Sequence, residues 1–136
     1  MSGKGTESNP WILTTPAGKS QFEMHIDPEK GVLHCQVGKT WLHYQVRALE
    51  DLHTMLENHG GWIELGNKDE KDTPKEGTVE AWARSDSNPV GGWYGLRKGY
   101  RGRFANYVAP VLREQGRVEF EKRGRGWWVR STENGS

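Results

Sequence analysis

A short basic segment carries the residue types that nucleic-acid binding requires. Residues 96–104 (LRKGYRGRF) interleave cationic side chains with aromatic ones, and their glycines allow close approach of the backbone to a ligand. Cations neutralise phosphates and aromatic rings stack on bases. The alternative is a solvated loop whose aromatic side chains turn into the core. With two arginines near the C-terminus, the candidate nucleic-acid-binding residues are Arg97, Lys98, Arg101, Arg103, Arg123 and Arg125.

Three histidines form a second candidate site. His25, His34 and His43 fall on the polar positions of three alternating segments. If residues 38–39 form a two-residue turn, His34 faces His43, and alignment of the apolar faces sets His25 beside His34. Three imidazoles in a row can ligate zinc and leave a fourth position for water. The alternative is an exposed polar face covered by Trp41.

The chain shows no motif of nucleophilic catalysis or phosphate transfer. Cys35 lies on the apolar side of its predicted strand, where a thiol is usually buried and inert. No serine stands in a nucleophile-elbow pattern, and the glycines of residues 91–99 lack the Walker lysine–serine pair. We therefore expect a binding protein rather than an enzyme, and we predict no cofactor.

Charge is distributed unevenly along the chain. Residues 93–130 hold ten Lys/Arg against three acidic residues, a net charge of +7, whereas residues 1–92 hold nine Lys/Arg against fourteen acidic residues, a net charge of −5. This separation predicts either a basic surface with an anionic partner or two halves that attract each other. In the second case the arginines pair with the acidic stretch 69–76.

Composition predicts a cytoplasmic protein that does not contact a membrane. The first ten residues (MSGKGTESNP) have no apolar stretch of the secretory kind, and the longest apolar runs are too short to cross a bilayer. One cysteine fits a reducing compartment. A chain of 136 residues fits one domain. We expect a mobile tail at 1–9 and a single domain at 10–136, made of the parts 10–66 and 78–130.

Alternation of apolar and polar residues predicts strands at 21–26, 32–37 and 40–46. The pattern then changes to the helical period over 48–59, with Glu50 and Asp51 in the first turn and Gly60 as the stop. We expect this helix to lie on the apolar face of the sheet.

The second part is predicted to be mainly helical. Residues 78–84 form either a short helix capped by Thr78, which we favour, or a strand. A longer helix is expected from about 103 to 115, where Pro110 should kink or divide it. A basic hairpin follows, with strands at 118–120 and 127–130. The predicted core residues of the two long helices are Leu49, Leu52, Leu56, Phe104, Val108 and Leu112.

Several stretches resemble a family of small bacterial proteins of uncharacterised function. They are GTESNPW (5–11), VGKTWLHY (37–44), DLHTMLENHG (51–60), GTVEAWARSDSNPVGGWYGLRKGYRGRF (77–104) and LREQG (112–116). The resemblance covers most of the chain and implies one shared domain plan. It carries no activity, cofactor or catalytic residue with it.

The last third is also similar to the final helix and wing of winged-helix proteins. A helix ending in LREQG precedes RVEFEKRGRGWWVR, as a helix precedes a basic hairpin in that fold. Pro110 departs from the uninterrupted recognition helix of the fold.

We therefore predict an α+β fold: an N-terminal antiparallel β-meander with a packing helix, then a helical segment ending in a winged-helix-like β-hairpin. The leading functional hypothesis is a non-enzymatic binding protein that contacts DNA or RNA through its basic C-terminal surface. The alternative is a protein-interaction or self-associating module. A metal-dependent site at the histidine row is the third hypothesis.

Overall fold

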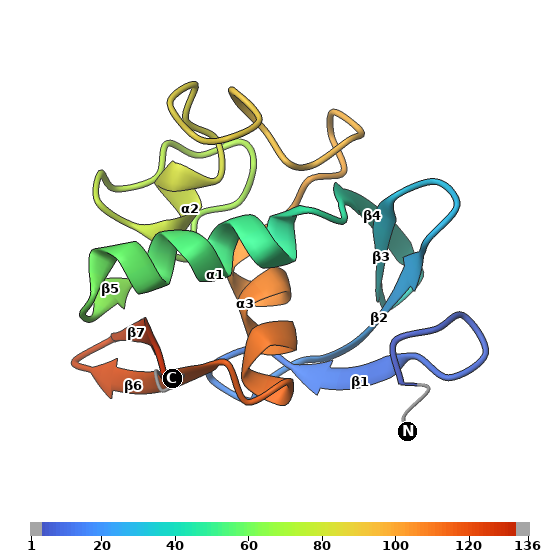
Figure 1. Ribbon diagram of the computed structural model, residues 1–136, viewed down its shortest axis with the longest axis horizontal. Coiled ribbons are helices and arrows are strands. Elements are labelled where there is room, and N and C mark those ends of the chain that lie inside the picture. Colours follow the sequence, from blue (N-terminus) through green and yellow to red (C-terminus); the bar gives the residue numbers. More distant parts are fainter. Residues whose placement is uncertain (1–3, 133–136) are drawn as a thin grey trace.

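Alternating apolar residues build a four-stranded antiparallel sheet at one end of the molecule (Figure 1). The computed structural model describes residues 4–132. The strands are β1 (Trp11–Thr14), β2 (Gln21–Asp27), β3 (Val32–Val37) and β4 (Thr40–Gln45), in the order β1-β2-β3-β4. The three predicted strands and their register are confirmed. Their inward side chains are buried: Phe22, Met24, Leu33, Cys35, Leu42 and Tyr44.

Helix α1 (Ala48–His59) has the bounds that its periodicity predicts. Gly60 ends it in the left-handed conformation, with φ of 78°, and its N–H donates to the Leu56 carbonyl oxygen at 3.1 Å. Leu49, Leu52 and Leu56 are buried as expected. The helix packs against α3 and β7, however, and does not lie across the four-stranded sheet. The expected position of α1 on the apolar face of the four-stranded sheet is wrong, because helix α3 (Phe104–Glu114) occupies that face.

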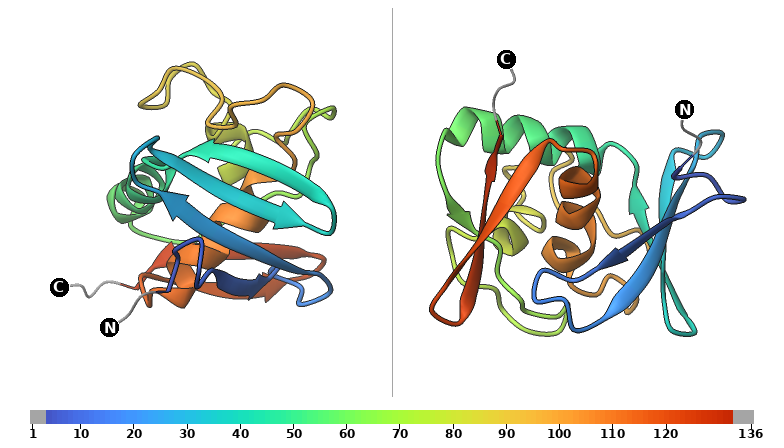
Figure 2. Two further views of the ribbon diagram at one scale, coloured as in Figure 1. Left: turned by 90° about the vertical axis from the view of Figure 1, so that its right-hand side faces the viewer. Right: turned by 90° about the horizontal axis from the view of Figure 1, so that it is seen from below.

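Helix α3 (Phe104–Glu114) runs between the two sheets and covers the inner face of the four-stranded one (Figure 2). Its Phe104 and Tyr107 rings lie edge-on against Tyr44 and Phe22, with centroids 5.6 and 5.0 Å apart. Pro110 was expected to kink or divide the helix, and it lies inside α3 without dividing it. Its ring is buried among apolar neighbours, and this burial offsets part of the roughly 3 kcal/mol that an interior proline costs a helix.

A second, smaller sheet closes the other side of α3. Its strands are β5 (Ile63–Glu64), β6 (Val118–Arg123) and β7 (Gly126–Ser131), in the order β5-β7-β6. The β6–β7 hairpin was predicted, whereas β5 and β1 are too short to give a periodic signal. The short helix α2 (Val79–Trp82) begins as expected, because the Thr78 hydroxyl accepts a hydrogen bond from the Ala81 N–H at 3.1 Å.

Residues 5–9, expected to belong to a mobile tail, make backbone contacts with one another and with the sheet. The Ile26 N–H donates to the Gly5 carbonyl oxygen at 2.8 Å, and Thr6 forms an antiparallel bridge with Asn9. A side chain at Gly5 would collide with the Trp11 ring, since a Cβ there would lie 2.6 Å from it. Residues 1–3 lie outside the described part of the chain.

One hydrophobic core includes side chains of both sheets and of all three helices. Cys35 lies inside it, and burial raises the pKa of its thiol, as expected of an inert cysteine. Over residues 4–132, no helix has the length and apolar character needed to cross a membrane.

Candidate nucleic-acid interface

The basic loop, residues 96–103, is suspended between the edge of the four-stranded sheet and the start of α3. Residues just before it extend the sheet: Gly95 bridges Tyr44, and the Leu96 N–H donates to the His43 carbonyl oxygen at 2.8 Å. At the other end, the buried Tyr44 hydroxyl donates a hydrogen bond to the Arg101 carbonyl oxygen. The loop is therefore attached to the sheet at both ends.

Gly102 allows the loop to lie close to the sheet. Its φ of +60° is left-handed, and a Cβ there would lie 2.9 Å from the Leu42 side chain. A larger residue would push the loop away from the core.

Three of the predicted nucleic-acid-binding cations are exposed on this loop: Arg97, Lys98 and Arg103. The Arg97 guanidinium lies over the Tyr100 ring, 4.4 Å from its centroid. Tyr100 is 42 % exposed, which is high for an aromatic side chain in a protein of this size. The loop thus offers cations and one accessible ring side by side.

Arg101 has a different environment, because its guanidinium is engaged within the fold. It lies over the Trp93 ring at 4.5 Å, and its Nε donates to the Gly95 carbonyl oxygen at 3.0 Å. One guanidinium nitrogen lies 3.6 Å from a carboxylate oxygen of Glu70. Arg101 is therefore a structural cation rather than an open contact residue.

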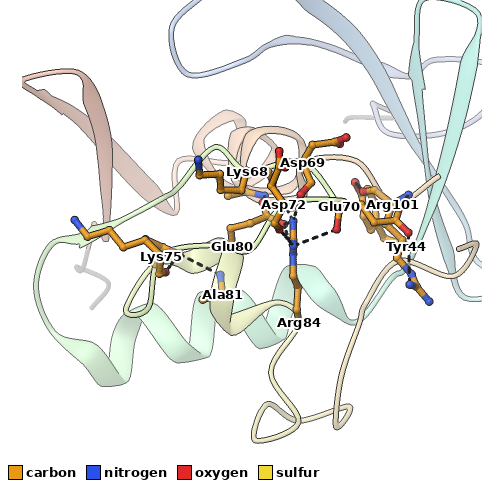
Figure 3. Close-up of polar contacts among 12 residues, drawn as sticks. Tyr44, Lys68, Asp69, Glu70, Asp72, Lys75, Glu80, Ala81, Arg84 and Arg101 are labelled. Atoms are coloured by element: carbon orange, nitrogen blue, oxygen red, sulfur yellow. Dashed lines mark hydrogen bonds and ion pairs between the residues drawn. The ribbon is translucent and has the colours of Figure 1, made fainter. Parts of the chain in front are cut away.

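A network of polar contacts behind the basic loop holds the charged loop, residues 66–77, in place (Figure 3). The Arg84 guanidinium donates to the carbonyl oxygens of Lys68, Asp69 and Asp72 at 3.0, 2.8 and 2.7 Å. It also lies over the Trp93 ring at 4.7 Å, on which Arg101 stacks as well.

Glu80 completes this network from inside the core. Its carboxylate accepts hydrogen bonds from Arg84 at 3.2 Å and from the Ala105 N–H, in the first turn of α3, at 3.0 Å. Burial raises the pKa of Glu80 to about 7, and these two partners oppose the shift in part. A shifted carboxylate often marks a functional site, but this one is 1 % exposed and lines a hollow of about 10 Å³, which is too small for a substrate.

A cleft of about 410 Å³ opens between the basic loop, the charged loop and the β3–β4 turn. This volume is within the range of small-ligand sites. Tyr107 contributes its half-buried ring, and burial raises the pKa of its hydroxyl. The lining residues are Val37, Thr40, Leu42, Asp69, Glu70, Lys71, Gly99, Tyr100, Gly102 and Tyr107.

The remaining two predicted cations, Arg123 and Arg125, do not join the basic loop. They belong to the β6–β7 hairpin, whose tip lies at the opposite end of the molecule from the basic loop (Figures 1 and 2). Arg123 pairs with Glu121 at 2.6 Å and lies over the Trp62 and Trp128 rings. Arg125 is exposed beside a separate hollow of about 260 Å³. The expected single basic surface is thus divided in two.

The histidine row has the predicted pairing on the outer face of the four-stranded sheet. His34 pairs with both His25 and His43, and the Nδ1 atoms of His34 and His43 are 2.7 Å apart. At that distance one ring must donate a proton and the other accept it. Trp41 lies edge-on over the row, with its ring centroid 6.0 Å from that of His25.

Two histidines of the row have a lowered pKa, which favours their neutral forms. Burial lowers the pKa of His34, as do the neighbouring His25 and His43, and burial together with Arg97 lowers the pKa of His43. Asp27 partly opposes the shift at His34, from a distance of 4.0 Å. Within residues 4–132, no group of three or more His, Cys, Asp or Glu side chains is arranged to hold a metal ion.

Sequence reasoning included Glu70 only as one member of the acidic stretch 69–76, and it missed Glu80, Arg84 and Trp93. These residues are separated from their partners by up to 31 positions in sequence, as in the Glu70–Arg101 contact. No local periodicity connects them. The single available signal was the placement of opposite charges in the two halves.

The structure is that of an α+β protein with two sheets and a basic loop beside a cleft. A family profile matches residues 3–132, and the chain belongs to that family, DUF6855, a family of unknown function. No curated protein and no solved structure gives a significant match.

Proposed function

We propose that this protein is a non-enzymatic binding protein whose basic loop contacts single-stranded nucleic acid, either DNA or RNA. One observation carries the proposal: Arg97, Lys98 and Arg103 are exposed on the same loop as Tyr100, which lines a cleft large enough for an unstacked base. Cations along a strand with a stacking ring between them are the usual means of binding single strands.

A single strand fits better than a duplex. A winged helix would present its last helix to the major groove, but most of α3 is buried between the sheets. In this chain a helix precedes a hairpin, as in a winged helix. Because α3 is mostly buried, however, we assign it no role in recognising nucleic acid. We place the binding in the bacterial cytoplasm, in line with the family resemblance and the lone cysteine.

The test is binding of a labelled single-stranded oligonucleotide over a salt series, measured by fluorescence anisotropy. The combined substitution Arg97→Ala and Lys98→Ala should weaken binding to all sequences. The slope of log K against log salt should become shallower by about 0.7 for each phosphate that the variant no longer neutralises. Tyr100→Ala should reduce the binding free energy by about a further 1–3 kcal/mol, which is the contribution of one base stacked on an aromatic ring.

The chain supplies a matched control for charge. Lys122→Ala with Arg125→Ala removes the same two positive charges from exposed positions at the opposite end of the molecule. This control should bind like the wild type. An equal loss in both double variants would point to nonspecific attraction, and absence of association at low salt would refute the proposal.

A second candidate function, docking of a protein partner or self-association, is favoured by the outer face of the four-stranded sheet. No helix of residues 4–132 covers this face (Figure 2). Ile12 and Trp41 project from it with 61 % and 41 % of their surface exposed. Sedimentation at several concentrations tests self-association, and Ile12→Ser should abolish any dimer formed through this face.

A further inference from the structure

The basic loop holds the carboxylate of Glu70 in the way that proteins hold a bound anion. One carboxylate oxygen accepts a hydrogen bond from the Gly99 N–H at 2.7 Å, and the other accepts one from the Arg101 N–H at 2.7 Å. The Arg101 guanidinium adds a positive charge 3.6 Å away. Two backbone N–H groups and one guanidinium are a donor set that also suits phosphate.

The loop keeps this shape through contacts that do not involve Glu70. The Tyr100 N–H donates to the Arg97 carbonyl oxygen at 2.9 Å, which closes a turn. Gly99 has a left-handed φ of +87° with open space where a Cβ would stand, so backbone conformation rather than packing requires glycine there. Arg101 is fixed through its carbonyl oxygen and its Nε, as described above.

The charged loop that carries Glu70 is also held independently. Arg84 binds its backbone carbonyl oxygens on both sides of Glu70, and none of those contacts uses the Glu70 carboxylate (Figure 3). The side chain of Glu70 is 13 % exposed and borders the cleft. A rotation of this one side chain would therefore free the donors without unfolding either loop.

We propose that the N–H groups of Gly99 and Arg101, together with the Arg101 guanidinium, form a phosphate-binding site in which Glu70 is an internal competitor. A phosphate group occupies the site when the Glu70 side chain rotates away. That the phosphate belongs to a nucleic-acid strand rests on the proposed function. The site itself can be examined with inorganic phosphate alone.

The experiment is a titration of the folded, ¹⁵N-labelled protein with inorganic phosphate, followed by the amide signals of Gly99 and Arg101. Glu70→Ala should give a saturable shift of both signals. Its affinity for phosphate should exceed that of the wild type by about tenfold or more, because charge-assisted donors become available.

Asp69→Ala is the matched control. It removes the same charge from the neighbouring position, and within residues 4–132 the Asp69 side chain makes no hydrogen bond or ion pair. It should respond like the wild type. Glu70→Gln, which keeps one acceptor and the side-chain shape, serves as a second variant if the alanine variant is unstable.

The outcomes separate the two proposals. If Glu70→Ala is folded and its Gly99 and Arg101 signals do not respond, the site is refuted. An equal gain in Asp69→Ala, or equal binding by the wild type, also refutes competition by Glu70. If Glu70→Ala binds phosphate while no form binds the oligonucleotide, the site stands and the nucleic-acid function fails.

Discussion

Replacing Glu80 with glutamine should change how the stability of this protein depends on pH. The carboxylate is 1 % exposed, and burial raises its pKa from an ordinary value of 4.5 to about 7. The folded state then binds more protons than the unfolded state between these two values. Stability contributed by protonated Glu80 is fully present below pH 4.5 and is lost as pH rises towards about 7.

The size of the effect follows from the shift. At about 1.4 kcal/mol per pH unit, the free energy of unfolding should fall by about 3 kcal/mol across this window. Glutamine has nearly the shape of the protonated acid, and its oxygen can accept the hydrogen bond from the Ala105 N–H, but its NH2 group cannot accept the one that the other Glu80 oxygen takes from Arg84. Glu80→Gln should therefore carry a cost that is the same at every pH, while its stability relative to the wild type should rise by about 3 kcal/mol between pH 4.5 and about pH 7.5.

The free energies of unfolding of the wild type and of Glu80→Gln can be measured at several pH values by urea unfolding, with tryptophan fluorescence as the signal. The histidines with lowered pKa, His34 and His43, contribute the opposite slope, because they lose stability as pH falls below their ordinary value of 6.5. Both proteins share that contribution, so the difference between them isolates Glu80. A difference between the two proteins that stays constant from pH 4.5 to about pH 7.5 would refute the reasoning, since the Arg84 ion pair would then outweigh desolvation and keep Glu80 ionised.

Three further substitutions test the packing that positions the site, each by chemical unfolding. Leu52→Ala removes a fully buried side chain from α1 and should cost about 2–5 kcal/mol; unchanged stability would mean that the side chain is not in the core. Tyr44→Phe leaves the loop carbonyl oxygen without its donor and should cost about 1–3 kcal/mol, whereas no change would show that the contact is not formed in solution. Gly102→Ala combines a left-handed φ with a collision against Leu42, so it should cost more than Gly124→Ala, which has a similar φ but open space; equal costs would contradict the close approach.

Local patterns were sufficient for the elements with strong periodicity. The alternation around His25, His34 and His43 fixed both pairs of strands, because a slip of one residue would move the buried set into water. Strand β5, with two residues, exists only because β7 pairs with it. The position of α1 was wrong for a related reason: both long helices have an apolar face, and periodicity does not decide which one covers a given sheet.

The candidate site could be predicted only in part. Sequence identified the exposed cations and Tyr100 because composition alone marks that segment. The prediction placed these cations and Arg125 on one surface because both segments are basic, although the basic loop and the hairpin lie at opposite ends of the molecule. Charge made the acidic stretch 69–76 a possible partner of the arginines, but it did not indicate that Glu70 takes the backbone N–H donors of the basic loop, since that contact depends on how two loops meet.

The separation of charge along the chain is partly used to hold the two halves together. Arg101 pairs with Glu70, and Arg117 binds Glu50 through two hydrogen bonds of 2.7 and 2.9 Å. The hydrogen bonds from Arg117 lower the pKa of Glu50. The expected attraction between halves and the expected basic surface are therefore not exclusive alternatives, because different arginines serve each.

Two arginines of the hairpin are paired with nearby glutamates. Arg123 pairs with Glu121 on the same strand, β6, and Arg130 of β7 pairs with Glu119 of the adjacent strand β6. Exposed pairs of this kind contribute little to stability, but each offsets one positive charge of the hairpin.

Lys122 and Arg125 remain exposed on the hairpin, at the opposite end of the molecule from the basic loop. The basic loop differs because its exposed cations share a segment with Tyr100, which lines the cleft. Binding measured at low salt should consequently depend on this loop more than on the hairpin. The three cations on which it should depend are Arg97, Lys98 and Arg103.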